Sequence, residues 1–152
     1  MGWKNKLKKL IENSSEKGKN KITYLDSTIE SINSINFILD YIKQNDRSFT
    51  FNKIQLLYRG SRDRDRTKTC HELCDDKQNV LILMQSDSGY IFGGYPKIGF
   101  KTINDKDKIE YKIDNNCFLF SVNLKRIYPV IKDKKVICHI EDHYGLCIFI
   151  IV

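Results

Sequence analysis

Residues 56–95, LLYRGSRDRDRTKTCHELCDDKQNVLILMQSDSGYIFGGY, hold most of the local structural signals in this chain. Two apolar runs, Val80–Met84 and Tyr90–Tyr95, flank the sequence Gln-Ser-Asp-Ser-Gly. Gly89 can adopt the positive φ that a tight turn needs, so the segment predicts a β-hairpin. All five positions of Val80–Met84 are apolar, which predicts that this strand is buried on both faces.

Short apolar runs separated by turn residues continue on both sides of this hairpin. Upstream, Ile54–Tyr58 reads as a strand and Arg66–Cys74 as a short helix capped by Asp65. Downstream, strands are expected at Ile109–Ile113, Cys117–Val122, Ile127–Ile131, Val136–Ile140 and Leu146–Ile151. Many short strands with helices grouped before them indicate an α+β fold or a helix-flanked β-sandwich.

Two helical segments are expected before the strands. Residues 1–21 form a basic leader in which Trp3, Leu7, Leu10 and Ile11 make an apolar helical stripe. This leader is either a solvated extension or a surface for anionic membrane or acidic protein. Residues 22–48 form an amphipathic or coiled-coil-like helix, whose apolar spacings of three and four favour docking on the domain that follows, residues 49–152.

The amino-acid composition limits the classes of protein to which this chain can belong. The chain has 152 residues, 41% of them hydrophobic and 30% charged, which fits one water-exposed globular domain. Seven of its lysines and two glutamates lie in residues 1–21, giving 7 − 2 = +5 of the total net charge of +7. The globular part is therefore near neutral, which argues against nucleic-acid binding. Without a secretory signal, the five cysteines are expected to be reduced thiols of a cytoplasmic protein.

Cysteine and histidine residues form two clusters that are far apart in sequence: Cys70, His71 and Cys74, and Cys138, His139, His143 and Cys147. Together they could supply a tetrahedral zinc site, although no C-x2-C pair is present. A thiol nucleophile is the second alternative, but neighbouring helical residues such as Cys70 and His71 point about 100° apart. We therefore expect no catalytic residue, metal or cofactor, and keep a zinc- or thiol-dependent enzyme as the alternative.

Four arginines within eight residues, Arg59, Arg62, Arg64 and Arg66, could grip phosphates. Asp63 and Asp65 alternate with them, which favours internal ion pairs and a solvated turn. A nucleic-acid or membrane-surface adaptor that uses these arginines and residues 1–21 stays open as a third reading. Gly93-Gly94 lacks the further glycines and following helix of a phosphate-binding loop, so it is interpreted as a close backbone approach.

Taken together, these motifs resemble the TLDc domain, especially its protist versions. The resemblance spans about residues 54–149 and rests on Leu56–Asp63, on His71, Cys74, Asp75 and Lys77, on Val80–Leu83, on Gly89–Tyr95, on Cys117–Val122 and on Tyr144-Gly145. It implies a sandwich of two antiparallel sheets with flanking helices. It also implies a non-enzymatic interaction domain with a protein partner, in oxidative-stress protection or in regulation of the vacuolar proton ATPase.

The chain departs from the TLDc pattern at three places. Arg64 stands where the family usually has glycine, which puts a positive-φ turn there in doubt. Phe100 stands roughly where tryptophan is common. Residues 143–152 lack the family's glycine-rich run and final strand, so the domain is expected to be shortened at its C-terminus.

Overall fold

The hairpin predicted at the centre of residues 56–95 is present in the computed structural model, which describes residues 32–47, 49–50, 54–64, 66–103, 110–139 and 147–148. Its strands β1 (Ile82–Gln85) and β2 (Ile91–Tyr95) pair antiparallel. Gly89 in the connecting turn has φ = +82°. The prediction that Val80–Met84 is buried on both faces is wrong at its end, because the Met84 side chain is 45% exposed.

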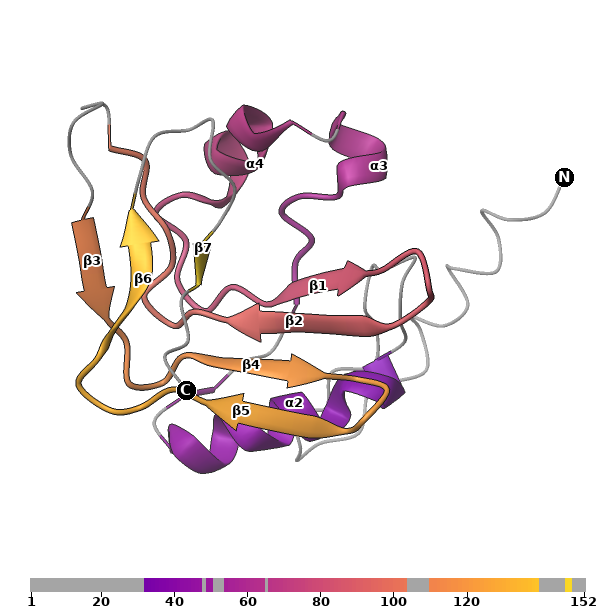
Figure 1. Ribbon diagram of the computed structural model, residues 1–152, viewed down its shortest axis with the longest axis vertical. Helices are drawn as coiled ribbons and strands as arrows, with labels where there is room; N and C mark the ends of the chain where they lie inside the picture. The colour runs from indigo at the N-terminus through magenta and orange to yellow at the C-terminus, as the bar shows by residue number, and fades with distance from the viewer. Residues whose placement is uncertain are drawn as a thin grey trace, which may run out of the picture.

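Two antiparallel sheets make up the strand layer (Figure 1). The larger has the order β1-β2-β4-β5, with β4 at Phe118–Ser121 and β5 at Arg126–Pro129. The smaller has the order β3-β6-β7, with β3 at Glu110–Ile113, β6 at Lys135–His139 and β7 at Cys147–Ile148. Together with the helices, these sheets confirm the expected α+β fold.

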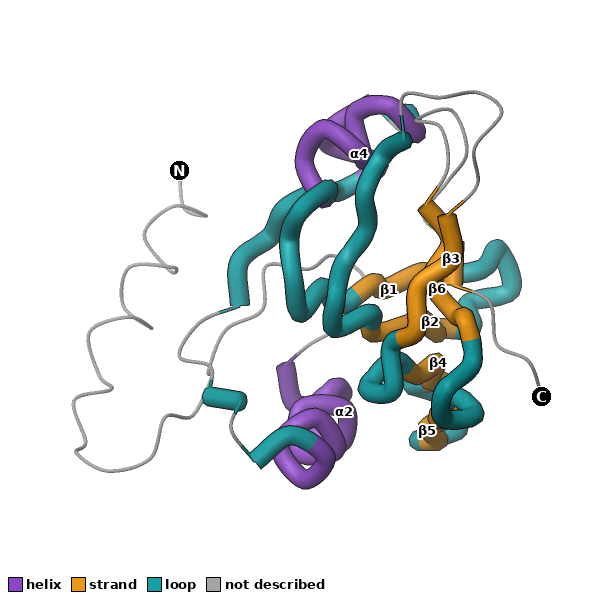
Figure 2. The backbone as a smooth tube through the Cα atoms, turned by 90° about the vertical axis from the view of Figure 1, so that its left-hand side faces the viewer, coloured by secondary structure: helices purple, strands orange, loops and turns teal. Residues whose placement is uncertain are grey.

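Within the described residues, three helices precede the strands: α2 (Ile32–Asn45), α3 (Gly60–Asp63) and α4 (Thr67–Cys74). Helix α2 buries its apolar stripe, including Ile35 and Ile38, in one cluster with β2 and β4. Figure 2 shows α2 on one side of the four-stranded sheet. The expected docking of this helix on the strands is therefore present, whereas the expected leader at residues 1–21 lies outside the described residues.

One sequence-based expectation upstream of the hairpin is wrong, and a second falls on a residue outside the described part of the chain. Ile54–Tyr58 has no strand pairing, although its apolar residues still pack, as Ile54 does against the core. Helix α4 begins after Arg66, which adopts an extended backbone and makes no side-chain capping bond; the expected cap Asp65 lies outside the described residues. The error at Ile54–Tyr58 arises because a short run carries little information about which neighbour it will pair with.

The side chains form two cores. One lies between α2 and the four-stranded sheet and contains, among others, Phe118 and Phe120. The second contains Phe100, Cys117, Val130, Val136 and Ile137, with Ile82 of β1 packed against it. The second core therefore joins the small sheet to one end of the large one. No helix in the described part of the chain is long and apolar enough to cross a membrane.

Candidate functional site

The arginine-rich turn is held together by its own ion pair. Arg62 donates from Nε to Asp63 Oδ1 and from Nη2 to Asp63 Oδ2, both at 2.7 Å. The Arg59 backbone N–H also donates to Asp63, at 2.8 Å. The hydrogen bonds from the Arg62 side chain, and then the one from Arg59, hold the pKa of the Asp63 carboxyl below its ordinary value. This turn is thus paired internally as expected.

Arg64 closes α3 in the left-handed region, with φ = +75° and ψ = +17°, and its N–H donates to the Gly60 carbonyl. The positive-φ turn, which was in doubt because glycine is absent, therefore forms with arginine at this position. A non-glycine residue in this region costs about 1–2 kcal/mol. The hydrogen bonds of Asp63 on the same turn offset that cost.

A buried histidine of helix α4 and a half-buried carboxylate just after it connect the helix to a distant loop. His71 is 4% exposed, and its Nδ1 lies 2.8 Å from Asp75 Oδ1. The other carboxylate oxygen of Asp75 accepts from the Thr102 N–H at 2.6 Å and from the Thr102 hydroxyl at 2.5 Å. The pair therefore fixes the end of α4 to residues 100–102, where Asp75 also bridges to Phe100.

Two thiols lie on the same helix, one turn apart. Cys74 is buried and Cys70 is half-buried, and both are free. A hydrogen bond between them lowers the pKa of the Cys74 thiol, assisted by the nearby His71. The same hydrogen bond, together with burial, raises the pKa of the Cys70 thiol. The pKa of the pair's first proton therefore lies below that of an ordinary thiol, and the pKa of its second proton lies above it.

The second cysteine–histidine cluster is only partly within the described residues. Cys138 and His139 lie in β6, and the backbone register places Cys138 directly opposite Cys147 of β7. His143 lies outside the described residues. Within the part of the chain that the structure describes, no group of three or more histidine, cysteine, aspartate or glutamate side chains could hold a metal ion.

Asp114 is a buried carboxylate whose contacts were not predicted from the sequence. Asp114 is 4% exposed and follows β3. Its Oδ2 accepts from the backbone N–H groups of Lys97 at 2.7 Å and Ile98 at 3.1 Å, and its Oδ1 accepts from Asn116 at 3.1 Å. The Asp-Asn-Asn sequence signals a turn, but nothing local signals the loop after β2 as its partner. Asp114 is a structural anchor between two loops.

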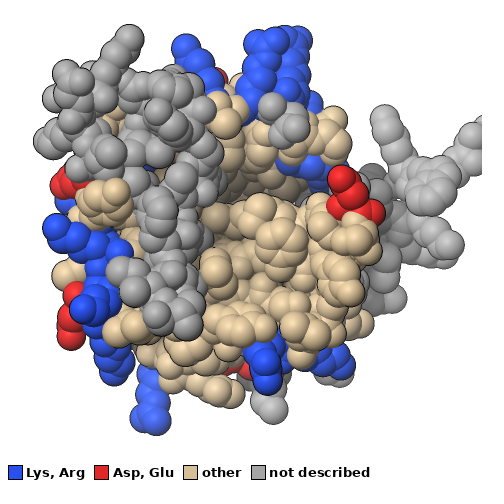
Figure 3. Space-filling view, in the orientation of Figure 1, with Lys and Arg blue, Asp and Glu red and all other residues tan. Residues whose placement is uncertain are grey.

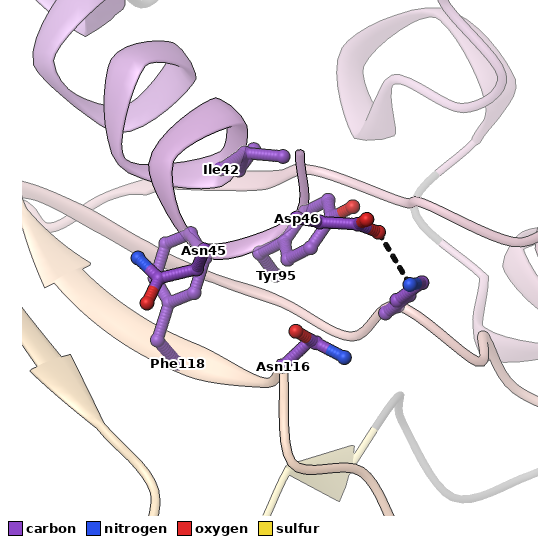
Figure 4. Close-up of a pocket in the computed structure, with 7 residues that line it drawn as sticks. Ile42, Asn45, Asp46, Tyr95, Asn116 and Phe118 are labelled. Atoms are coloured by element: carbon purple, nitrogen blue, oxygen red, sulfur yellow. Dashed lines mark hydrogen bonds and ion pairs between the residues drawn. The ribbon is translucent and has the colours of Figure 1, made fainter. Parts of the chain in front are cut away.

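A small hollow lies beside this anchor, where the end of α2 meets β2 and β4 (Figure 4). Its volume, about 10 Å³, is about the space that one water molecule needs. Asp46 forms an ion pair with Lys97 at its edge, and the buried Tyr95 hydroxyl donates to Asn79 Oδ1 at 2.9 Å. The polar groups that line it are thus engaged with one another, and the space does not fit a substrate.

One face of the four-stranded sheet carries a group of exposed apolar side chains. Met84, Phe92 and Tyr128 are 45%, 40% and 39% exposed, and Leu119 lies among them, half-buried. The register pairs Met84 with Phe92 and Leu119 with Tyr128, on the side away from α2. We call these four residues the open face. Figure 3, which looks onto it, shows mostly uncharged side chains at the centre of the view.

A family model described as the TLDc domain matches residues 11–148. The chain belongs to the TLDc domain family. No curated protein and no solved structure matches the chain. The TLDc family is associated with proteins of the oxidation-resistance type.

Family membership explains where the recognised motifs lie in the fold. Residues Leu56–Asp63 of the TLDc pattern lead into α3, and the glycine-rich motif forms β2. Phe100, which replaces a common tryptophan, is 2% exposed within the second core. The departure at this position therefore still fills a core site of the TLDc domain.

Proposed function

We propose that this TLDc domain acts without catalysis, as a cytoplasmic module that binds a protein partner through the open face. By the resemblance of its motifs, the role is protection against oxidative stress or regulation of the vacuolar proton ATPase. The observation that carries the proposal is the exposure of Met84, Phe92 and Tyr128 on one face of the four-stranded sheet. Uncovered apolar side chains grouped in this way mark interaction sites.

The size of the open face indicates what covers it. Four strands spaced about 4.8 Å apart, with four or five residues each at about 3.3 Å per residue, present roughly 200–300 Å². A stable dimer needs about 800 Å² from each subunit. A second copy of this chain would thus be held by less than half the area required. An α-helix about 10 Å wide and two to three turns long matches the face.

The charge of the face specifies the chemistry of that helix. The open face itself has no charged member, and Arg126 lies at its rim on β5. A carboxylate or ammonium group buried against it would have no partner. The partner therefore presents one amphipathic helix with an apolar, uncharged stripe; by the resemblance of the motifs, we expect that helix in a subunit of the proton pump.

The test is direct binding of purified chain to the purified peripheral sector of the vacuolar ATPase. Phe92→Asp buries a carboxylate in the contact and should weaken binding at least tenfold, about 1.4 kcal/mol or more. Leu124→Asp is the matched control, because Leu124 is 65% exposed on the turn between β4 and β5. It should bind as tightly as the unmodified chain, with both variants retaining the same thermal unfolding profile.

Four results would overturn the proposal. The unmodified chain fails to bind, or Phe92→Asp binds equally well. Binding that occurs only after residues 1–21 are removed would mean that the leader of the same chain occupies the face. Sedimentation that shows a dimer dispersed by Phe92→Asp would assign the face to a second copy.

A further inference from the structure

The two thiols of α4 form an arrangement that partner binding does not use. Cys70 and Cys74 are four residues apart in one helix, so their side chains share a face. Cys70 is half-buried, while Cys74 is 4% exposed. Cys70 thus connects the pair to solvent. The open face lies on the four-stranded sheet, so the two features can be tested separately.

The pairing of the two thiols favours one thiolate beside one thiol and outweighs the burial of Cys74, which opposes the charge. The hydrogen bond between the sulfurs stabilises the negative charge that remains when one proton leaves. His71 acts in the same direction, whereas the carboxylates of Asp75 and Asp63 oppose it. A thiolate with a second thiol in contact is the arrangement found at redox-active cysteine sites.

We propose that Cys70 and Cys74 are an oxidant-responsive pair that a hydroperoxide converts into a disulfide. In the first step, the thiolate of the pair attacks the terminal oxygen of the hydroperoxide. The O–O bond breaks, a sulfenic acid forms, and the alkoxide leaves and takes a proton from water. In the second step, the sulfur of the other cysteine attacks the sulfenic sulfur. The S–S bond forms, the S–O bond breaks, and the hydroxide leaves as water with the proton of that thiol.

The two steps together balance in atoms and electrons. Two thiols are oxidised by two electrons, and one hydroperoxide is reduced to an alcohol and one water molecule. No metal or further cofactor takes part. A thiol reductant such as glutathione would reverse the change by thiol–disulfide exchange.

The position of the pair at the end of α4 allows the bond to form. Side chains four apart in a helix have Cβ atoms about 5–6 Å apart, whereas a disulfide needs about 3.5–4.5 Å. Cys74 is the last residue of α4, and Asp75 after it is already extended, with φ = −62° and ψ = +149°. Only the final turn has to move.

Closing the disulfide has a structural consequence beyond α4. Asp75 is bonded to Thr102 and bridges to Phe100, and it follows directly on Cys74. Moving the end of the helix therefore weakens the contact with residues 100–102. The oxidised chain should show faster amide hydrogen exchange at Thr102, while the β1–β2 hairpin keeps its protection.

The experiment treats the full chain with hydrogen peroxide and follows its cysteines by mass spectrometry after tryptic digestion. Residues 69–77 lie between Lys68 and Lys77, so one peptide contains both thiols. The mass of that peptide should fall by the mass of two hydrogen atoms as the disulfide forms. This reaction should be at least ten times faster than the oxidation of Cys117. Cys117 is the internal control because it is 1% exposed.

Variants that lack one of the two cysteines should accumulate the sulfenic acid. In Cys70→Ser and in Cys74→Ser the sulfenic acid cannot be resolved, so at least one of them should be labelled by dimedone while the unmodified chain is not. The proposal fails if the peptide of the unmodified chain stays reduced or oxidises no faster than Cys117. It also fails if either thiol is found bonded to a cysteine outside residues 69–77.

Discussion

Single residues in this domain act mainly by satisfying backbone groups that would otherwise be buried without a partner. Asp114 accepts three backbone N–H groups from two loops. Asp63 and Asp75 each serve one end of a short helix. Such carboxylates look like reactive groups in a sequence, yet their hydrogen bonds are fully used in holding loops together.

Arg64 is the residue whose replacement should stabilise the fold. It is exposed and has φ = +75°, a conformation that glycine adopts without steric cost. We expect Arg64→Gly to raise the free energy of unfolding by about 0.5–1 kcal/mol, after allowing for the greater freedom of glycine in the unfolded chain. Thermal unfolding followed by circular dichroism should show a rise of about 1–4 °C.

Arg66→Gly is the control for that prediction, because Arg66 has φ = −115°. Glycine relieves no strain there, so Arg66→Gly should leave the melting temperature unchanged or slightly lower. Equal stabilisation by both substitutions would show that loss of positive charge, rather than backbone conformation, is responsible.

Strands β1, β2 and β4 pack so closely around Gly93 that no side chain larger than that of glycine fits there. In β2, a Cβ atom built on Gly93 would lie 1.8 Å from the Ile82 carbonyl oxygen and 2.8 Å from Cζ of Phe120. Gly93 therefore allows β1 and β4 to flank β2 while Phe120 packs over it. The Gly-Gly sequence is thus a packing feature of the sheet.

Gly93→Ala should lower the free energy of unfolding by about 3 kcal/mol or more, because backbone of β1 must move. Gly89→Ala provides a comparison of the same chemical change. Its Cβ would meet nothing within 4 Å, but φ there is +82°, so we expect a loss of about 1–2 kcal/mol. Urea unfolding of both variants measures the difference, and a larger loss for Gly89→Ala would contradict the packing argument.

At the scale of the whole molecule, two cores share the four-stranded sheet. The first closes one face with α2, and the second joins one end of the sheet to β6. The remaining part of the other face is the open face. The stability of the second core is linked to pH, because it contains the buried thiol of Cys117.

Burial raises the pKa of Cys117 from 9.0 to about 12. Below pH 9 the thiol is neutral in both states, and its contribution to stability is complete. Between pH 9 and pH 12 it ionises only in the unfolded chain, so stability falls as pH rises, by about 4 kcal/mol in total at 1.4 kcal/mol for each pKa unit.

Cys117→Ala should flatten this dependence. Urea unfolding under reducing conditions at pH 8, 9.5 and 10.5 measures the free energy of unfolding of Cys117→Ala and of the unmodified chain. At pH 8 the thiol is neutral in both states, so the difference between the two chains there gives the part of the loss that does not depend on pH. The difference between the chains should shrink as pH rises. Parallel curves would mean that the thiol is not buried in the second core.

Several features of this protein followed from its amino-acid sequence alone. The hairpin, the alternation of short strands, the apolar stripe of α2 and the family were all readable, because each depends on local periodicity, turn chemistry or a recognisable motif. The expected strand at Ile54–Tyr58 was wrong, because a short apolar run does not specify the strand with which it would pair. The Cys70–Cys74 pair was visible as a spacing, but its exposure and hydrogen bonding were not.

Tertiary structure decided the features that depend on residues far apart in the chain. Asp114 meets the loop at Lys97, and Asp75 meets Thr102 across 27 positions. Met84, Phe92 and Tyr128 become one surface only when β1, β2, β4 and β5 align in register. Local sequence specifies which face of a strand is apolar. Only the packing of α2 and the second core determines which apolar residues are left uncovered, because burial belongs to the whole assembly of elements.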